Sequence, residues 1–213
     1  MNDFARCIAC ICFAFVSGAS QAQSVRWTFE GLLGDAYNFD SKTRIDHPNV
    51  DDSAFDGDYD TRGLEGPFHY VWRISRWTDS RAWELQLMHH KLFLQNRPAG
   101  VEWLSVSHGF NVVTVNRTFE SRDWRFRVGA GPVITHAEAS IAGTNYDGPY
   151  ELAGAAVLIG VDKTISLGSR FFVVGEVDAT FGYIESQPSG DPDLEFSISN
   201  PALHAQLGLG YRF

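Results

Sequence analysis

The sequence predicts an all-β fold, an eight-stranded antiparallel up-and-down transmembrane β-barrel. Three observations predict it: an export-type N-terminus, runs in which apolar and polar residues alternate, and aromatic residues near the ends of those runs. A soluble β-sandwich alternates in the same way, but aromatic girdles are typical of membrane interfaces and favour the barrel. The aromatic residues assigned to the girdles are Trp27, Tyr37, Tyr70, Trp72, Trp77, Trp83, Trp103, Trp124, Tyr183 and Tyr211.

The N-terminus has the three-part layout of a secretory signal peptide. Arg6 precedes an apolar run over residues 7–16, and small and polar residues follow as far as Ala22. The run is too short for a transmembrane helix, which needs about 20 residues. We therefore expect a signal peptide over residues 1–22 and a barrel domain over 23–213. All three cysteines lie in the removed segment, so the mature chain would have no thiol, and no cofactor is expected.

Eight runs with a period of two are long enough to be barrel strands. Short connections alternate with longer ones, and the longest connection covers residues 40–65. An even strand number with this alternation is typical of bacterial barrels, whose tight turns lie in the periplasm and whose longer loops lie outside. The predicted strands are 25–39, 66–77, 81–95, 101–119, 124–139, 150–165, 170–185 and 196–213.

One face of these runs is apolar and the other carries charge. Trp124, Phe126 and Val128, for example, alternate with Arg125 and Arg127. The interior of an eight-stranded barrel is wide enough only for side chains, and an unpaired charge there would be costly. The inward charges should therefore pair and plug the lumen. The predicted lumenal polar network is Glu30, Arg73, Glu84, Arg125, Arg127, Glu176, Asp178 and Arg212.

The final strand places Leu207, Leu209, Tyr211 and Phe213 on one face. A terminal phenylalanine with an aromatic residue two positions earlier resembles the C-terminal signature by which the barrel-assembly machinery recognises outer-membrane proteins. The resemblance implies an integral protein of the bacterial outer membrane, with the assembly machinery, outer-membrane lipids and lipopolysaccharide as partners. The net charge of -9 argues against a nucleic-acid partner.

The alternation is least regular around Gly109. Leu104 and Val106 place the apolar set on even positions, whereas Val113 and Val115 place it on odd positions. A β-bulge near the glycine would reconcile the two halves of the run. Bulges are enriched beside functional sites, so this segment is the candidate site of the chain.

The residues around the predicted bulge leave an acyl hydrolase open. A serine activated by a histidine that a carboxylate orients is the arrangement of serine catalysis. Small outer-membrane barrels of similar size include lipid A deacylases. The deacylase motif, however, places histidine two residues before serine and asparagine after it, whereas this chain has Ser107, His108 and Gly109 in order. The candidates are Ser105, Ser107, His89, His90, His108, Glu102 and Glu138.

Two groups of residues in the sequence could bind a metal ion. His89, His90, His108 and His136 could converge with Glu138, but adjacent residues on a strand point to opposite faces, so His89 and His90 cannot easily share an ion.

In the long first loop, a series of aspartates could supply oxygen ligands to calcium. Their spacing is not that of the helix-loop-helix calcium motif, and a solvated acidic loop is the preferred interpretation. The calcium candidates are Asp52, Asp56, Asp58 and Asp60.

The sequence thus favours an outer-membrane barrel with a plugged polar lumen and a structural or surface-interaction role. The first alternative is a lipid A or phospholipid acyl hydrolase of the outer membrane. The second is a narrow permeation protein for small solutes.

Overall fold

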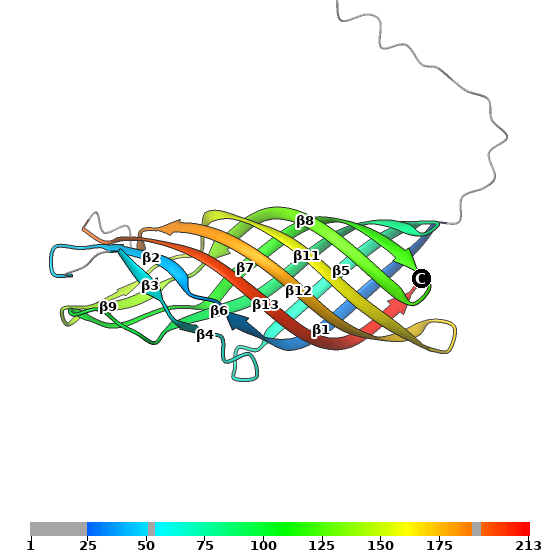
Figure 1. The fold of residues 1–213 in the computed structure, drawn as a ribbon, viewed down its shortest axis with the longest axis horizontal. Coiled ribbons are helices and arrows are strands. Elements are labelled where there is room, and N and C mark those ends of the chain that lie inside the picture. The colour runs from blue at the N-terminus through cyan, green and yellow to red at the C-terminus, as the bar shows by residue number, and fades with distance from the viewer. Residues whose placement is uncertain (1–24, 51–53, 189–192) are drawn as a thin grey trace, which may run out of the picture.

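The computed structural model describes residues 25–50, 54–188 and 193–213 as one closed antiparallel barrel (Figure 1). The predicted signal peptide, residues 1–22, lies outside the described residues. The predicted fold class is confirmed, because eight of the described strands form the ring. The ring strands are β1 (Val25–Asn38), β5 (His69–Thr78), β6 (Arg81–Leu94), β7 (Val101–Ser121), β8 (Trp124–Thr135), β11 (Glu151–Leu167), β12 (Phe171–Ser186) and β13 (Glu195–Arg212).

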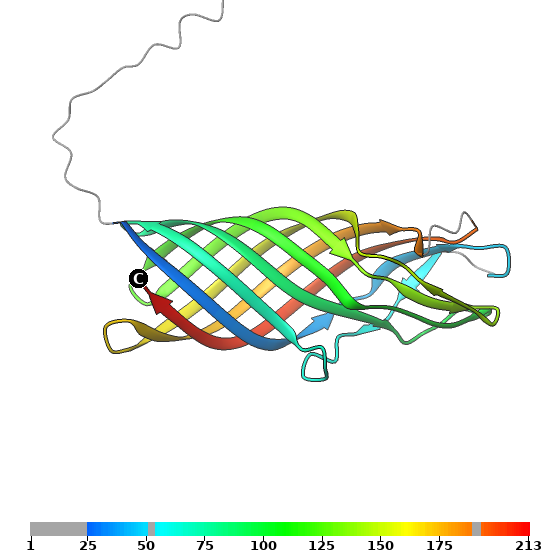
Figure 2. The same ribbon diagram turned by 180° about the vertical axis from the view of Figure 1, so that it is seen from behind.

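The ring closes where the first strand pairs with the last. Strand β1 pairs with β5 on one side and with β13 on the other, with Phe29 opposite Tyr211 in the β1–β13 ladder. The amide of Phe213 donates a hydrogen bond to the Trp27 carbonyl, 3.0 Å away. The described chain therefore starts and ends at one end of the barrel, called the turn end here because short turns connect the strands there (Figure 2). The opposite end is called the loop end.

The predicted loops at the loop end contain further strands. These are β2 (Ser41–Asp46), β3 (Ala54–Gly57), β4 (Tyr59–Asp60), β9 (Glu138–Ile141) and β10 (Thr144–Asp147). Strand β2 pairs with β13, β9 pairs with β7, and β4 pairs with β6. The predicted first loop, residues 40–65, contains β2, β3 and β4, because long ring strands leave backbone edges that neighbouring segments can pair with. The wall of the barrel thus continues into a sheet beyond the ring (Figures 1 and 2).

The outer wall of the ring is apolar. Large hydrophobic side chains on every ring strand are exposed, and they include Phe29, Leu33, Trp72, Ile74, Leu85, Val115, Phe126, Val128, Val157, Ile159, Val177, Phe181, Leu203, Leu207 and Leu209. In water this surface would be a large unburied patch, whereas in a bilayer it faces hydrocarbon. The described residues contain no helix that is long and apolar enough to cross a membrane.

Trp77, which was predicted to belong to an aromatic girdle, points into the lumen and not outward. Trp77 is fully buried inside the ring, and its indole Nε1 donates a hydrogen bond to Thr28 Oγ1 at 3.1 Å. The parity of the strand explains the correction, because Trp77 falls in the inward row with Arg73 and Ser75. A tryptophan near a strand end belongs to the girdle only when it lies in the outward row.

Candidate functional site

The middle of the lumen is filled by three arginines. Arg73 from β5 and Arg125 and Arg127 from β8 point inward, and their side chains are at most 2% exposed. An isolated charge in such a place would be strongly disfavoured, so each guanidinium needs close carboxylate partners.

Two of these arginines share a carboxylate. Arg73 donates to Glu30 Oε2 at 2.8 Å and to Glu176 Oε1 at 2.6 Å. Arg125 donates to the other oxygen of Glu30 at 2.6 Å and to Asp162 Oδ1 at 2.6 Å. Glu30 on β1 therefore links β5 to β8, although these strands are not neighbours in the ring.

The third arginine contacts more carboxylates. Arg127 forms ion pairs with Asp162 and Glu176, and its Nε lies 3.2 Å from Glu84 Oε1. Its Nη1 also lies 3.6 Å from Asp178 Oδ1. Since these carboxylates come from β6, β11 and β12, the network crosses the lumen and connects opposite walls.

The structure brings seven of the eight predicted network residues together and leaves Arg212 out. Near the turn end, Arg212 lies over the Phe172 ring, 4.4 Å from its centroid, and donates to Ser166 Oγ at 3.2 Å. The prediction for Arg212 was wrong because β13 ends there and the side chain is only partly buried. Asp162 was missed, although its alternation with the exposed Lys163 places it on the inward face.

Aromatic rings close the lumen at the turn end. Trp77 and Phe172 are buried inside the barrel, and the guanidinium of Arg125 lies 5.9 Å and 5.6 Å from their ring centroids. Cation–π contacts of this kind stabilise a charge that has left water. The rings and the arginine network form two successive layers across the lumen.

The predicted irregularity near Gly109 is present. The ladder between β6 and β7 is regular up to the pair His90–Phe110 and resumes at Leu92–Val106. Gly109 and the two residues before it therefore oppose a single residue of β6. The glycine has a φ of 144°, a conformation that L-residues rarely adopt, so the bulge requires this glycine.

Beside the bulge, a serine, a histidine and a carboxylate meet. Ser107 Oγ donates to Glu138 Oε2 at 3.2 Å and lies 3.4 Å from His108 Nδ1. The same Nδ1 lies 3.5 Å from Glu138 Oε2. A catalytic triad uses one imidazole nitrogen toward the serine and the other toward the carboxylate. Here Ser107 and Glu138 both face Nδ1 of His108, and the hydroxyl of Ser107 donates its proton to Glu138.

The other catalytic candidates are divided between this group and distant positions. Ser105 Oγ donates to the hydroxyl of Ser107 at 3.4 Å, a long contact. Glu102 accepts from the Gly143 amide at 3.1 Å instead of joining the serines. His90 lies inside the lumen, with Nε2 3.0 Å from Asn38 Oδ1.

The predicted histidine site is split by the wall of the barrel. His89 faces outward, where its ring stacks on Tyr70 and its Nδ1 lies 2.8 Å from Asn111 Oδ1. His108 and His136 lie together at the bulge with a ring separation of 5.2 Å, and with Glu138 they form one of two groups of possible metal ligands among the described residues. His90 belongs to the other group, inside the lumen.

The calcium candidates do not form such a group in the described chain. Asp56 forms an ion pair with Lys42 at 2.5 Å, and Asp60 pairs with Arg62 at 3.3 Å. The amide of Asp58 donates to Asn96 Oδ1 at 2.7 Å. Asp52 lies outside the described residues.

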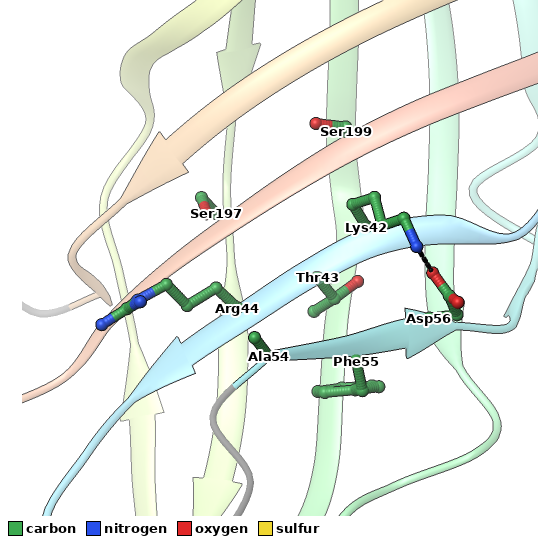
Figure 3. Close-up of a pocket in the computed structure, with 8 residues that line it drawn as sticks. All are labelled: Lys42, Thr43, Arg44, Ala54, Phe55, Asp56, Ser197 and Ser199. Carbon is green, nitrogen blue, oxygen red and sulfur yellow. Dashed lines mark hydrogen bonds and ion pairs between the residues drawn. The ribbon is translucent and has the colours of Figure 1, made fainter.

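On the loop-end sheet, a hollow of about 370 Å³ is open to solvent (Figure 3). Lys42 and Arg44 from β2 rise beside it, and the small side chains of Ser197 and Ser199 from β13 leave the space between them. The two cationic side chains are 79% and 60% exposed. Lys42 pairs with Asp56 and Arg44 with Asp46, so an anionic ligand from outside would have to compete with these two carboxylates for the cations.

The residues of the predicted assembly signature lie on the outer wall of β13. Leu207, Leu209 and Phe213 are exposed, and Tyr211 packs edge-on against Phe213 with ring centroids 5.1 Å apart. The row is therefore free to face lipid, or a partner during insertion.

No family model and no curated protein matches this chain. Among solved structures, the outer membrane protein AlkL in lipid bilayers aligns with a TM-score of 0.54 and 13% identity, over 95% of this chain and 96% of that chain. OprG from Pseudomonas aeruginosa aligns with a TM-score of 0.43 and 14% identity, over 89% and 94% of the two chains. Ail of Yersinia pestis aligns with a TM-score of 0.39 and 12% identity, over 90% and 99%.

The likeness to AlkL extends over nearly the whole of both chains and shows the fold. The closed ring and its apolar outer wall independently meet the requirement that a membrane-spanning sheet leave no open edge in hydrocarbon. This chain is therefore an integral β-barrel of the bacterial outer-membrane type.

Proposed function

We propose that the protein is a non-conducting outer-membrane barrel whose loop-end sheet is an interaction surface for lipopolysaccharide. The observation that carries the proposal is the continuation of the ring strands into that sheet, with two exposed cations beside an open hollow. Flexible loops would offer no fixed arrangement of charges, whereas paired strands do.

The filled lumen supports the non-conducting part of the proposal. The arginine network and the aromatic layer both cross the lumen, and their side chains are buried. Eight-stranded barrels in general have an interior that side chains fill. A permeation pathway would require these ion pairs to separate, which is unfavourable because each leaves a buried charge unpaired.

The position of the hollow supports an outer-leaflet ligand. Strand β2 is paired with the part of β13 that extends beyond the ring (Figure 1), so the hollow would lie on the outer side of the membrane if the longer loops face outward, as in bacterial barrels. Lipopolysaccharide carries phosphate and carboxylate groups at that height. Lys42 and Arg44 would exchange their exposed partners Asp56 and Asp46 for such anions, a small cost because exposed ion pairs contribute little, and the hydroxyls of Ser197 and Ser199 can donate further hydrogen bonds.

The test is binding of purified lipopolysaccharide to the detergent-folded barrel. The double variant Lys42→Ala, Arg44→Ala should bind about tenfold more weakly, equivalent to about 1.4 kcal/mol. The matched control is Arg81→Ala, Arg122→Ala, which removes the same charge at the turn end. Added salt should weaken wild-type binding, because exposed charges are screened. Equal affinity of the two double variants would refute the proposed surface.

The acyl hydrolase alternative receives less support from the geometry. Ser107 donates to a carboxylate, and His108 turns one nitrogen toward both partners. No imidazole of the described bulge is placed to accept the serine proton while a carboxylate holds its second nitrogen.

A further inference from the structure

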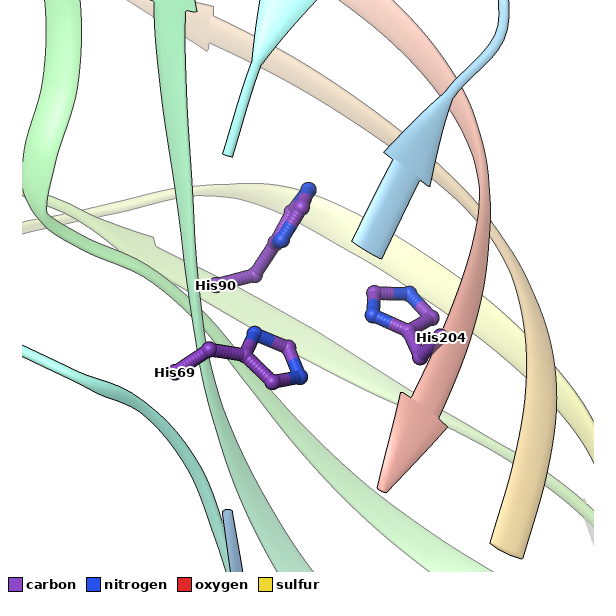
Figure 4. A group of neighbouring side chains, drawn as sticks. All are labelled: His69, His90 and His204. Carbon is purple, nitrogen blue, oxygen red and sulfur yellow. The ribbon is translucent and has the colours of Figure 1, made fainter. Parts of the chain in front are cut away.

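Three histidines converge in the lumen near the loop end (Figure 4). His69 from β5, His90 from β6 and His204 from β13 are all buried, and their ring centroids are 5.0 to 5.7 Å apart. Each offers a ring nitrogen within 4.8 Å of the other two. The cluster is distinct from the hollow on the loop-end sheet and from the bulge.

The surroundings of His90 fix its tautomer. Asn38 Nδ2 donates to the Tyr59 carbonyl and to Thr61 Oγ1, so its Oδ1 is the acceptor for His90 Nε2 at 3.0 Å. The ring proton of His90 is therefore on Nε2, and the lone pair is on Nδ1. A histidine that binds a metal through one ring nitrogen usually donates the N–H of its other ring nitrogen to a carbonyl or carboxylate oxygen, as His90 does here.

His204 also has one nitrogen with a hydrogen-bond partner and one without. Its Nε2 lies 2.8 Å from Thr180 Oγ1, and its Nδ1 has no hydrogen-bond partner among the described residues. Neither nitrogen of His69 has a partner in the described chain, and His90 Nδ1 has none either. Buried polar atoms are almost always satisfied, so three neighbouring buried rings that all carry unpartnered nitrogens require an explanation.

We propose that His69, His90 and His204 form a binding site for a divalent transition metal of the zinc class. Neutral imidazoles suit zinc, copper and nickel, whereas magnesium and calcium prefer oxygen ligands. Three imidazole nitrogens around zinc lie about 3.3 Å apart when each bond is about 2.05 Å long. The ring nitrogens lie within 4.8 Å of one another, so small side-chain rotations would bring them to this spacing. The fourth position stays open to water or a small anion.

The charge of the lumen supports a dication. The described network has two more carboxylates than guanidinium groups, and Asp178 stands opposite His204 in the β12–β13 ladder. Asp178 is the network carboxylate farthest from an arginine partner, at 3.6 Å from Arg127. A metal dication held by the three neutral rings would place positive charge beside this carboxylate.

The test loads the full mature barrel with zinc during refolding in detergent and then removes free metal. One equivalent should remain, and X-ray absorption of the wild-type protein should report three imidazole ligands. Cobalt in place of zinc should give the intense visible bands of a tetrahedral site. Because the ligands come from three strands, the metal should also raise the thermal midpoint of the barrel.

Single variants identify the ligands. His69→Gln, His90→Gln and His204→Gln should each lower zinc affinity at least tenfold, with folding checked by gel mobility without boiling. The matched controls are His89→Gln, on the outward face of β6, and His136→Gln, at the bulge; both should bind like the wild type. The proposal would be overturned if, among these variants, only His136→Gln lost the zinc. It would also be overturned if the wild type bound no metal or showed fewer than three imidazole ligands.

Discussion

At the scale of single residues, the lumen depends on the pairing of charges that have left water. Arg127 is in contact with carboxylates from three strands, and its side chain is fully buried. Gly160 makes room for this group, because a β-carbon there would lie 1.9 Å from Asp178 Oδ1. The network therefore requires a glycine at position 160 as well as the charged side chains.

Replacement of Arg127 by methionine tests this view. The variant leaves Glu84, Asp162 and Glu176 with one guanidinium fewer, which should lower the free energy of unfolding by about 3 to 5 kcal/mol. Urea titration of the detergent-folded barrel, followed by gel mobility, measures the change. Lys163→Met is the control, since that ammonium faces outward over Trp124. Equal midpoints for the two variants would show that the network adds little stability.

A second prediction at this scale concerns Ser107. If the group at the bulge is not catalytic, Ser107→Ala leaves lipid A and phospholipid acylation unchanged, because the wild type releases no acyl chain either. Mass spectrometry of lipid A from cells with and without the protein measures this. Loss of one acyl chain that depends on Ser105 or Ser107 would establish the hydrolase instead and identify its nucleophile.

The residues of the network could be predicted from strand parity, but their partners could not. Parity places Glu30 and Arg73 inward, while the height of each in the lumen depends on the register between strands. The histidine cluster shows this limit most clearly. His69 and His204 are far apart in sequence and meet only because β13 closes on β1, which pairs with β5.

At the scale of elements, the eight ring strands were predictable because each is long and alternates in one phase. Strand β2 alternates as well, with Ser41, Thr43 and Ile45 buried, but it is only six residues long and lies in an acidic segment. Its pairing partner is the part of β13 beyond the ring, which no local pattern reveals. Short strands stabilised by a distant edge escape sequence analysis for this reason.

The C-terminal phenylalanine that follows the last strand is expected to direct assembly of the barrel. Removal of Phe213 takes away the terminal aromatic of the outward row and its packing against Tyr211. The amount of protein in outer-membrane fractions should fall, because the shortened strand lacks the assembly signature that it resembles. Immunoblots of fractionated cells provide the measurement, with Phe181→Leu, an outward aromatic of β12 away from Tyr211, as the control. An unchanged yield would mean that the C-terminus does not direct assembly.

At the scale of the whole molecule, the wall and the interior have opposite chemistry. The outer face is apolar around the ring, and the inner face is filled by buried charges, histidines and aromatic rings. A closed ring without a free edge resists unfolding in detergent, so the folded protein should migrate differently from the boiled protein on a denaturing gel. The proposed surface at the loop end relies on this rigid support.

The proposed function requires that the barrel is closed to ions and acts through its surface. The direct test is conductance of the purified wild-type protein in planar bilayers, since the arginine network and the aromatic layer cross the described lumen. We predict no discrete current steps in concentrated potassium chloride at moderate voltage. Stable, reproducible channels in the wild type, lost when the protein is boiled before addition, would contradict the proposed non-conducting barrel.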